Sequence, residues 1–228
     1  QEQVFKVLNP EQTMVYHNNE WLGAMGLDSF IELASSYTVS RILERDDFSK
    51  RMASQTPIGM HECLYPLLQG YDSVVLKSDV EIGGTDQTFN LLLGRHLQKQ
   101  DGQREQAVLT LPILEGTDGQ QKMSKSLANH IGINDTPQDM YGKLLSIPDT
   151  LILRYFRLLS QRSNAEVAAL EKQLADGANP KHIKEELAID LVSFFHDKAA
   201  AEAAREHFQT MFAKKQIPDD IPELDISA

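Results

Sequence analysis

Three polar side chains with helical spacing form the first candidate site in this chain of 228 residues. Tyr65, Gln69 and Asp72 stand at positions i, i+4 and i+7, so a helix would place them on one face. A phenol, an amide and a carboxylate together suit an ammonium group or a hydroxyl, so this face could hold a small zwitterion. The same spacing is typical of the exposed polar stripe of an amphipathic helix, and both interpretations stay open here.

A second candidate is the sequence Gly-Gly-Thr-Asp-Gln at residues 83–87, which stands between a predicted strand and a predicted helix. Two glycines let a ligand approach the backbone closely, and the helix that follows begins with free N–H groups. Asp86 could accept hydrogen bonds from ribose hydroxyls, at the strand end where ligands of open α/β sheets bind. The alternative is a tight turn in which Asp86 only caps the helix.

The third candidate is the pentapeptide Lys-Met-Ser-Lys-Ser at residues 122–126, which lies in a glycine-bearing loop. Its two lysines and two hydroxyls could grip a pyrophosphate as it leaves, because cations placed where charge develops stabilise a transition state. A loop can also close over a nucleotide and open again for release. The alternative is a solvated basic turn.

Strand and helix patterns around these candidates predict a βαβ unit. Residues 79–82 and 107–111 read as strands, and a helical pattern begins at Thr85. A strand, a helix and a second strand favour a βαβ crossover and a parallel sheet. Pro66 is expected either to begin the helix that carries the first candidate site or to kink it.

Helical patterns follow one another after residue 134, with no convincing strand among them. They begin near residues 137, 149, 164, 180 and 199. We therefore predict an α/β domain over residues 1–130 and an all-α domain over residues 131–216. Residues 217–228 are acidic and contain two prolines, so we expect a linker there.

Composition limits the class of protein. Apolar residues make up 41% of the chain, charged residues make up 24%, and the net charge is −11, which is typical of a globular protein without general affinity for nucleic acid. Cys63 is the single cysteine and the seven histidines lack metal-ligand spacing, so we expect no disulfide within the chain and no protein-bound metal. No apolar run reaches the roughly 20 residues that span a bilayer. We expect no membrane association and a cytoplasmic location.

The pentapeptide at residues 122–126 matches, letter for letter, the second signature of class I aminoacyl-tRNA synthetases. The stretch YPLLQGYDSVVLKSDVEIGGTDQTFN, from Tyr65 to Asn90, resembles the bacterial tyrosyl-tRNA synthetase family, in which YxxxQxxD precedes GGTDQ. The resemblance covers nearly the whole chain. It implies the second half of a class I Rossmann-like nucleotide-binding fold, followed by a helical anticodon-side domain.

The resemblance implies roles in tyrosine binding for four side chains. Tyr65 and Gln69 would contact the amino group of tyrosine, and Asp72 would accept a hydrogen bond from its phenolic hydroxyl. Gln87 would lie against the reacting carboxylate. Glu81 falls where the family has another polar residue on the substrate side.

Nucleotide-binding roles follow from the same resemblance. Gly84 and Asp86 would hold the ribose of ATP. Lys122, Lys125 and Ser126 would be the mobile-loop contacts to pyrophosphate. Magnesium would accompany ATP as part of the substrate, with no metal held by the protein.

The reaction implied is the joining of tyrosine to ATP, which gives tyrosyl-adenylate and pyrophosphate, followed by transfer of tyrosine to tRNA(Tyr). The segment from Trp21 to Met52 resembles the family's dimer interface, so a homodimer is expected. The first class I signature, HIGH, is missing, since the similar sequence around His130 lacks the second histidine and follows the pentapeptide. We therefore expect a fragment that holds half of an active site and lacks a C-terminal RNA-binding domain.

Two other functions remain open from the sequence. One is a tryptophanyl-tRNA synthetase relative, although those relatives differ in the helix that carries the YxxxQxxD pattern. The other is a non-catalytic binding module that reuses the same scaffold.

Overall fold

The computed structural model describes residues 2–213, which form two compact units. One unit is Met14–Ile113, and the other joins the chain up to Thr13 to the chain from Leu114 onwards. The boundary between the compact units thus lies between Ile113 and Leu114, before the loop at residues 114–130. The domain boundary predicted from the sequence lies after this loop, between residues 130 and 131. That limit stays a prediction, and the predicted linker at 217–228 lies outside the described residues.

Two parallel strands form the sheet of the unit Met14–Ile113. Strand β1 (Val80–Gly84) pairs with β2 (Ala107–Leu111), with Val80 opposite Ala107 and Gly84 opposite Leu111. A short 3-10 helix (Thr85–Gln87) and helix α6 (Thr88–Gln100) join the strands. This βαβ connection confirms the predicted crossover.

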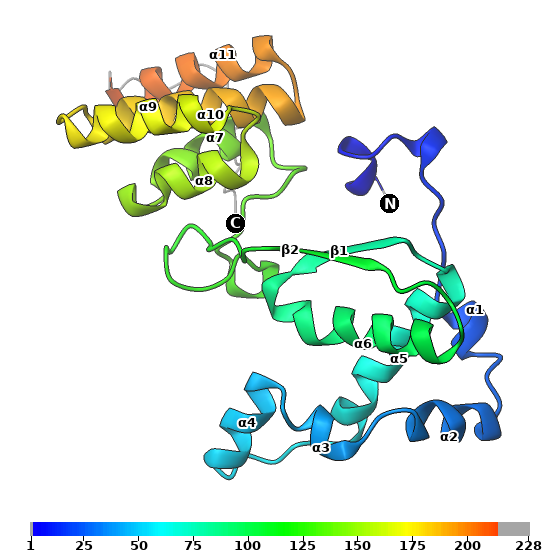
Figure 1. The fold of residues 1–228 in the computed structure, drawn as a ribbon. Coiled ribbons are helices and arrows are strands. Elements are labelled where there is room, and N and C mark those ends of the chain that lie inside the picture. Colours follow the sequence, from blue (N-terminus) through cyan, green and yellow to red (C-terminus); the bar gives the residue numbers. More distant parts are fainter. Residues whose placement is uncertain (1, 214–228) are drawn as a thin grey trace, which may run out of the picture. The chain divides into compact units, whose positions relative to one another are not determined.

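Helices α5 (Met60–Leu76) and α6 pack together on one side of this sheet (Figure 1). Leu67 and Val74 of α5 meet Leu93 and Leu97 of α6 in a buried apolar cluster. Pro66 is buried inside α5, so the helix begins well before the proline rather than at it. The two helices therefore form a firm support for the residues that follow β1.

Buried polar groups join this helix pair to the sheet. The backbone N–H of Gln106 donates to Oε1 of Gln98 (2.8 Å), and Nε2 of Gln98 donates to the carbonyl of Ser78 (3.0 Å). Oγ of Ser73 donates to Oε2 of Glu81 (2.7 Å), which also accepts from Nε2 of Gln106. An unpaired polar group would be costly here, so these bonds fix the helices against the strands.

The opposite face of the sheet is apolar and exposed. Its side chains Val80, Ile82, Leu109 and Leu111 are between 51% and 62% exposed. Parallel sheets are ordinarily covered on both faces. This face is therefore available to pack against further polypeptide.

Four short helices precede α5 in the same unit. They are α1 (Asn19–Leu22), α2 (Leu27–Ser35), α3 (Val39–Ile42) and α4 (Asp46–Ala53). Phe48 of α4 is fully buried, and the Arg45 guanidinium lies 4.5 Å from the centre of its ring. Phe48 belongs to the same buried apolar cluster as Leu67 and Val74 of α5.

Five helices make up most of the other unit. They are α7 (Pro137–Ser146), α8 (Ile152–Leu159), α9 (Asn164–Ala175), α10 (Pro180–Phe195) and α11 (Lys198–Phe208). Helix α10 packs against α7, α8 and α11, around a core that includes Tyr155, Phe156 and Leu187. The predicted α/β fold followed by a helical part is confirmed.

Local sequence explains where these helices begin. Ser163 and Glu166 form a capping box before α9, and the Asn179 side chain caps α10 ahead of Pro180. The remaining turns of helix in this unit are short. They are Val4–Lys6, Pro10–Gln12, Lys125–Leu127, Asp149–Leu151 and the π-helical turn Gln209–Ala213.

Candidate active site

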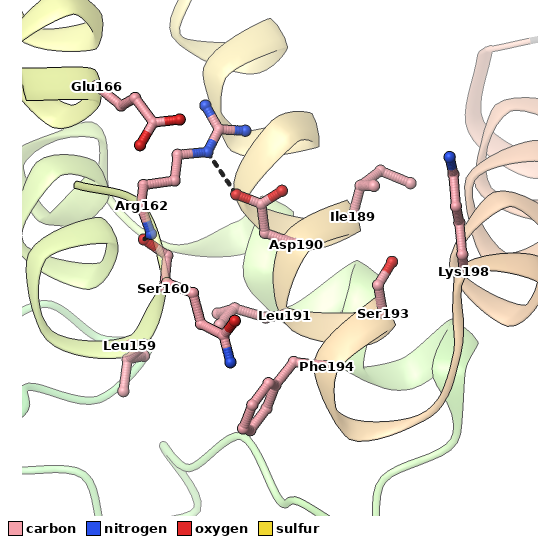
Figure 2. Close-up of a pocket in the computed structure, with 11 residues that line it drawn as sticks. Leu159, Ser160, Arg162, Glu166, Ile189, Asp190, Leu191, Ser193, Phe194 and Lys198 are labelled. Atoms are coloured by element: carbon pink, nitrogen blue, oxygen red, sulfur yellow. Dashed lines mark hydrogen bonds and ion pairs between the residues drawn. The ribbon is translucent and has the colours of Figure 1, made fainter.

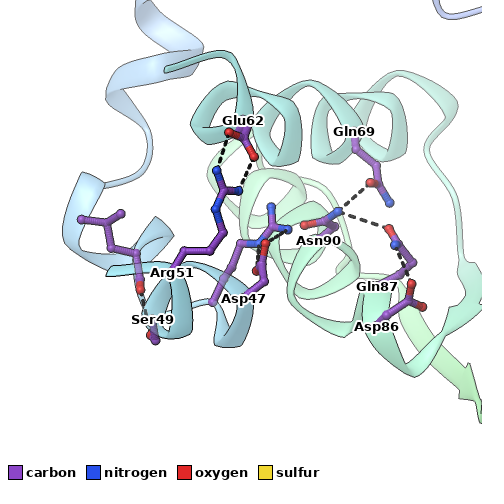
Figure 3. Close-up of polar contacts among 10 residues, drawn as sticks. Asp47, Ser49, Arg51, Glu62, Gln69, Asp86, Gln87 and Asn90 are labelled. Atoms are coloured by element: carbon purple, nitrogen blue, oxygen red, sulfur yellow. Dashed lines mark hydrogen bonds and ion pairs between the residues drawn. The ribbon is translucent and has the colours of Figure 1, made fainter. Parts of the chain in front are cut away.

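Helix α5 carries Tyr65, Gln69 and Asp72 in one uninterrupted run. The Tyr65 side chain is 55% exposed, whereas Gln69 and Asp72 are half-buried. The start of the helix is fixed by Glu62, whose Oε1 accepts from the backbone N–H of Gly59 (2.8 Å). The same oxygen accepts from Arg51 Nη2 (3.0 Å) (Figure 3). These bonds hold the beginning of α5 against α4, one turn before Tyr65.

The charge of Glu62 is strongly stabilised. The hydrogen bond from Arg51, followed by the one from the Gly59 N–H, lowers the pKa of Glu62 to about 2. Arg51 also donates to the carbonyl of Pro57, so one guanidinium binds both the loop before α5 and the first turn of α5. The carboxylate and the guanidinium therefore stay ionised over the whole physiological range.

Asn90, on α6, joins two of the predicted tyrosine-site residues. Its Nδ2 donates to Oε1 of Gln69 (2.8 Å) and to Oε1 of Gln87 (3.2 Å) (Figure 3). Gln87 Nε2 in turn donates to Oδ2 of Asp86 (3.4 Å). Asn90 is 4% exposed, so this chain of amides has a buried centre. It brings Gln69, Gln87 and Asp86 together.

Sequence reasoning missed Asn90 as a site residue, although it closes the stretch that carries the family resemblance. A signal was present in the sequence. An asparagine in the first turn of an otherwise leucine-rich helix, just after the polar loop, is a residue whose burial demands hydrogen-bond partners.

Asp72 has two partners of its own outside α5. Its Oδ1 accepts from the indole N–H of Trp21 (2.8 Å), and its Oδ2 accepts from Nδ2 of Asn18 (3.3 Å). With Trp21, Asn18 and Tyr16 it lines a pocket of about 270 Å³. A carboxylate has about four acceptor positions, so both oxygens keep room for a further donor.

The loop after β1 contains Gly83, Gly84, Thr85, Asp86 and Gln87, and it turns directly into α6. The Thr88 hydroxyl donates to the carbonyl of Thr85 (2.7 Å), which closes the first turn. A Cβ on Gly84 would clash with the Asp86 carboxylate, so the glycine allows the loop to fold back on itself. Asp86 is exposed at the carboxyl end of β1, where a ligand can reach it.

Glu81 differs from the other predicted polar residues. Its carboxylate accepts hydrogen bonds from Ser73 and Gln106 in the interface between the sheet and the helices. This pairing gives Glu81 a structural function in the described chain.

The loop at residues 122–126 is fixed at one side chain and exposed at its lysines. Met123 packs against the core of the helical unit, and its backbone N–H donates to the carbonyl of Leu114 (2.8 Å). Lys122 and Lys125 are exposed, and neither ammonium group forms an ion pair within the described residues. The arrangement presents two unpaired cations on an anchored loop, which suits the binding of a polyanion.

The hydroxyls of this loop bond to one another. Oγ of Ser124 and Oγ of Ser126 are 2.7 Å apart, and Oγ of Ser124 also accepts from the backbone N–H of Ser126 (3.2 Å). Ser124 is thus the cap of the short helix Lys125–Leu127. Lys122, Lys125 and Ser126 belong to the helical unit, whereas Tyr65, Gln69, Asp72, Gly84, Asp86 and Gln87 belong to the unit Met14–Ile113.

A pocket in the helical unit is separate from all of these residues. It has a volume of about 620 Å³ and is lined by Arg162, Asp190, Phe194 and Lys198 among others (Figure 2). Nε of Arg162 donates to Oδ2 of Asp190 (2.6 Å), so the one guanidinium in its wall is already neutralised. None of the predicted site residues lines this pocket.

Residues 2–213 contain neither a cluster of metal-ligating side chains nor a membrane-spanning helix. No group of three or more His, Cys, Asp or Glu side chains there could hold a metal ion. No helix in that range has the length and apolar character that crossing a bilayer requires. The absence of a protein-bound metal stays a prediction.

Comparison with known proteins identifies the class. The family of class I tRNA synthetases for tryptophan and tyrosine, described as "tRNA synthetases class I (W and Y)", matches residues 1–213. The chain therefore belongs to this family of class I aminoacyl-tRNA synthetases.

The curated relatives point to the tyrosine branch of that family. The chain is 53% identical over 226 residues to the tyrosine–tRNA ligase of Colwellia psychrerythraea, covering 99% of the chain and 57% of the relative. It is 54% identical over 222 residues to the tyrosine–tRNA ligase of Nitratidesulfovibrio vulgaris, covering 97% of the chain and 56% of the relative. The chain thus spans a little over half the length of these relatives.

Solved structures share the fold at lower identity. The tyrosyl-tRNA synthetase of Archaeoglobus fulgidus complexed with L-tyrosine gives a TM-score of 0.65 at 23% identity, covering 90% of this chain and 70% of that one. A truncated mitochondrial tyrosyl-tRNA synthetase of Coccidioides posadasii gives 0.63 at 21% identity, covering 83% and 56%. These likenesses confirm the predicted class I fold.

Proposed function

We propose that this chain is part of a tyrosine–tRNA ligase, which activates tyrosine with ATP and transfers it to tRNA(Tyr). The observation that carries the proposal is the amide chain centred on Asn90. It joins Gln69 of the helix α5 to Gln87 and Asp86 of the loop after β1. The hydrogen bonds support the proposal because they join residues proposed to bind the amino acid to residues proposed to bind the nucleotide.

The tyrosine-binding roles rest on donor and acceptor chemistry. Tyr65 and Gln69 would bind the ammonium group of tyrosine, since a phenol and an amide both offer acceptor oxygens. Asp72 would accept the phenolic O–H. Gln87 would lie against the carboxylate that attacks the α-phosphate of ATP. The amide of Gln87 is oriented for this by Asn90.

The residues proposed to bind the nucleotide lie in two loops, at residues 83–87 and 122–126. Gly84 and Asp86 would hold the ribose: Gly84 leaves room for the Asp86 carboxylate beside the backbone, and Asp86 would accept hydrogen bonds from the ribose hydroxyls. Lys122, Lys125 and Ser126 would bind the β- and γ-phosphates, where negative charge grows as the bond to the α-phosphate breaks. The carboxylate oxygen of tyrosine forms the new bond to phosphorus, and pyrophosphate leaves. Magnesium would enter with ATP.

Assembly and location are part of the same proposal. Leu27 and Ile31 of α2 and Val39 of α3 are between 57% and 73% exposed. This apolar surface within the segment Trp21 to Met52 would pair with a second copy, which gives a homodimer. The enzyme would act in the cytoplasm, with tyrosine, ATP and tRNA(Tyr) as its partners.

The proposal favours tyrosine over the alternatives. The relatives that match nearly the whole chain at 53–54% identity are named for tyrosine. The lysines of the loop at 122–126 are exposed and form no ion pair within the described residues, which leaves both ammonium groups available to phosphates.

The deciding experiment is ATP–pyrophosphate exchange by a full-length protein that contains this chain. Exchange should depend on tyrosine and be absent with tryptophan or with no amino acid. The isolated chain of residues 1–228 should show no exchange. Exchange driven by tryptophan, or none with any amino acid from a folded full-length protein, would overturn the proposal.

A further inference from the structure

Asn129 is buried against the loop at residues 122–126. It is 4% exposed, although it lies in an exposed stretch of chain that includes Leu127 and Ala128. Its side chain makes three hydrogen bonds. Oδ1 accepts from the backbone N–H of Ser124 (2.8 Å), and Nδ2 donates to the carbonyl of Lys122 (3.1 Å) and to Oδ2 of Asp118 (2.8 Å).

The backbone of Asn129 closes the same arrangement. Its carbonyl accepts from the N–H of Thr117 (2.8 Å), on the segment that leads into the loop. Gly116 lies against the Asn129 side chain so closely that a Cβ there would overlap it. The asparagine therefore packs against Gly116 and Thr117, which precede the loop, and it binds the loop backbone on either side of Met123.

Asp118 is ordered by the same contacts. Its Oδ1 accepts from the backbone N–H groups of Gln120 (2.9 Å) and Gln121 (3.0 Å), while its Oδ2 accepts from Asn129. The bond from Gln120, followed by those from Asn129 and Gln121, lowers the pKa of Asp118. The amide of Asn129 is thus held between a carboxylate on one side and two backbone groups of the loop on the other.

We propose that Asn129 is a positioning residue that fixes the shape of the loop 122–126 and keeps Lys122 and Lys125 turned to the substrate phosphates. The proposal rests on the function proposed above. A side chain that binds the loop backbone on both sides of Met123 sets the direction in which both lysines leave it. Loss of these bonds would leave the lysines present but poorly placed, which slows the chemical step.

The test compares four variants of a full-length protein that contains this chain. Asn129→Ala removes all three side-chain bonds. Asn129→Asp keeps the acceptor for Ser124 but places a second carboxylate against Asp118. The double variant Asp118→Asn/Asn129→Asp exchanges donor and acceptor across that pair and restores one bond. Asn134→Ala, an exposed asparagine nearby, is the matched control.

Two measurements separate positioning from a merely structural function. The first is hydrogen exchange of the Ser124 amide, which should become at least ~10-fold faster in Asn129→Ala. The second is tyrosine-dependent exchange of pyrophosphate into ATP. There kcat should fall about 10- to 100-fold, with KM for tyrosine unchanged and melting temperature recorded alongside. The double variant should recover part of the kcat that Asn129→Asp loses.

The anchoring of the loop, the positioning function and the proposed enzyme function each have their own contradicting result. An unchanged Ser124 exchange rate in Asn129→Ala would overturn the anchoring, whether or not the enzyme proves to be a ligase. A lower melting temperature with unchanged kcat, and no recovery in the double variant, would overturn the positioning function. An inactive wild-type protein would instead overturn the proposed function, while the Ser124 amide would still decide the anchoring.

Discussion

The indole N–H of Trp21 lies 2.8 Å from Oδ1 of Asp72, and this bond joins the short helix α1 to the middle of α5. Nδ2 of Asn18 binds the other oxygen of Asp72 at 3.3 Å. The carboxylate is therefore held in place from outside its own helix. A carboxylate fixed in this way suits the proposed role of Asp72 in binding one hydroxyl, since a mobile carboxylate could follow other donors.

The substitution Asp72→Ala, in a full-length enzyme, should reduce selection of tyrosine over phenylalanine more than it slows the reaction with phenylalanine. If Asp72 binds the tyrosine hydroxyl as proposed, phenylalanine would cover the carboxylate without offering it that donor, and the resulting penalty would disfavour phenylalanine. The measurement is kcat/KM for both amino acids, with a melting curve alongside. Trp21→Phe should shift the same ratio less, since Asn18 still holds Asp72. An unchanged ratio in Asp72→Ala would remove it from the specificity site.

Replacing Asn90 by alanine should weaken tyrosine binding and slow adenylate formation together. Gln69 and Gln87 would both lose their shared donor, which leaves the Gln69 amide less restrained and Gln87 held by its longer bond to Asp86 (3.4 Å). Loss of two hydrogen bonds in a buried position costs about 1–3 kcal/mol, which corresponds to roughly a 5- to 150-fold loss in kcat/KM for tyrosine. Steady-state kinetics would check this, with exposed Asn134→Ala as control. Loss of stability with unchanged kcat/KM would contradict it.

Lys125→Ala should slow adenylate formation while leaving tyrosine affinity nearly unchanged. A cation that acts mainly on the charge developing in the transition state affects kcat more than ground-state binding. The loss should be at most about 1,000-fold, the upper range for removal of one preorganised group. Single-turnover kinetics and equilibrium binding of tyrosine separate the two effects. Equal losses in both would argue against a pyrophosphate contact.

The ion pair of Arg51 with Glu62 predicts a specific response to acid. The pKa of Glu62 is lowered from 4.5 to about 2, so the pair stabilises the fold fully above about pH 4.5. That contribution declines as the pH falls from 4.5 through 2. The stability advantage of the wild type over Glu62→Gln should therefore shrink across this window. Carbon NMR of the Glu62 carboxyl should show a midpoint far below 4.5, and a midpoint near 4.5 would refute the pairing.

Two glycine substitutions should have opposite effects on stability. A Cβ on Gly94 in α6 would lie 2.7 Å from Oγ of Ser73 and 3.0 Å from Nε2 of Gln106, so Gly94→Ala should destabilise the fold by about 1–3 kcal/mol. Gly142 in α7 has open space around it, so Gly142→Ala should stabilise by about 0.5–1 kcal/mol. Urea unfolding, followed by NMR signals of each unit, measures both. A Gly94→Ala variant that is not destabilised would show that the side chains around Gly94 move to make room for the methyl group.

Local sequence determined most of the secondary-structure elements and indicated the family of this protein. Periodicity and capping residues fixed the βαβ unit and the helices α7 to α11, because these signals act over a few neighbouring residues. The pentapeptide at 122–126 and the pattern from Tyr65 to Asn90 indicated the family through their resemblance to its motifs, and the family match confirms it. The position of α5 relative to Pro66 was harder to predict, because tertiary packing outweighs the local penalty of a buried proline.

Tertiary structure alone decided which polar side chains meet. Asn90 donates to both Gln69 and Gln87. Glu81 accepts from Ser73 and Gln106. Asn129 accepts from the backbone of the loop at residues 122–126. A polar residue gives the same sequence signal whether it is exposed or buried. Its function depends on which distant groups satisfy its hydrogen bonds once water is excluded, and that is settled only when the helices and loops pack.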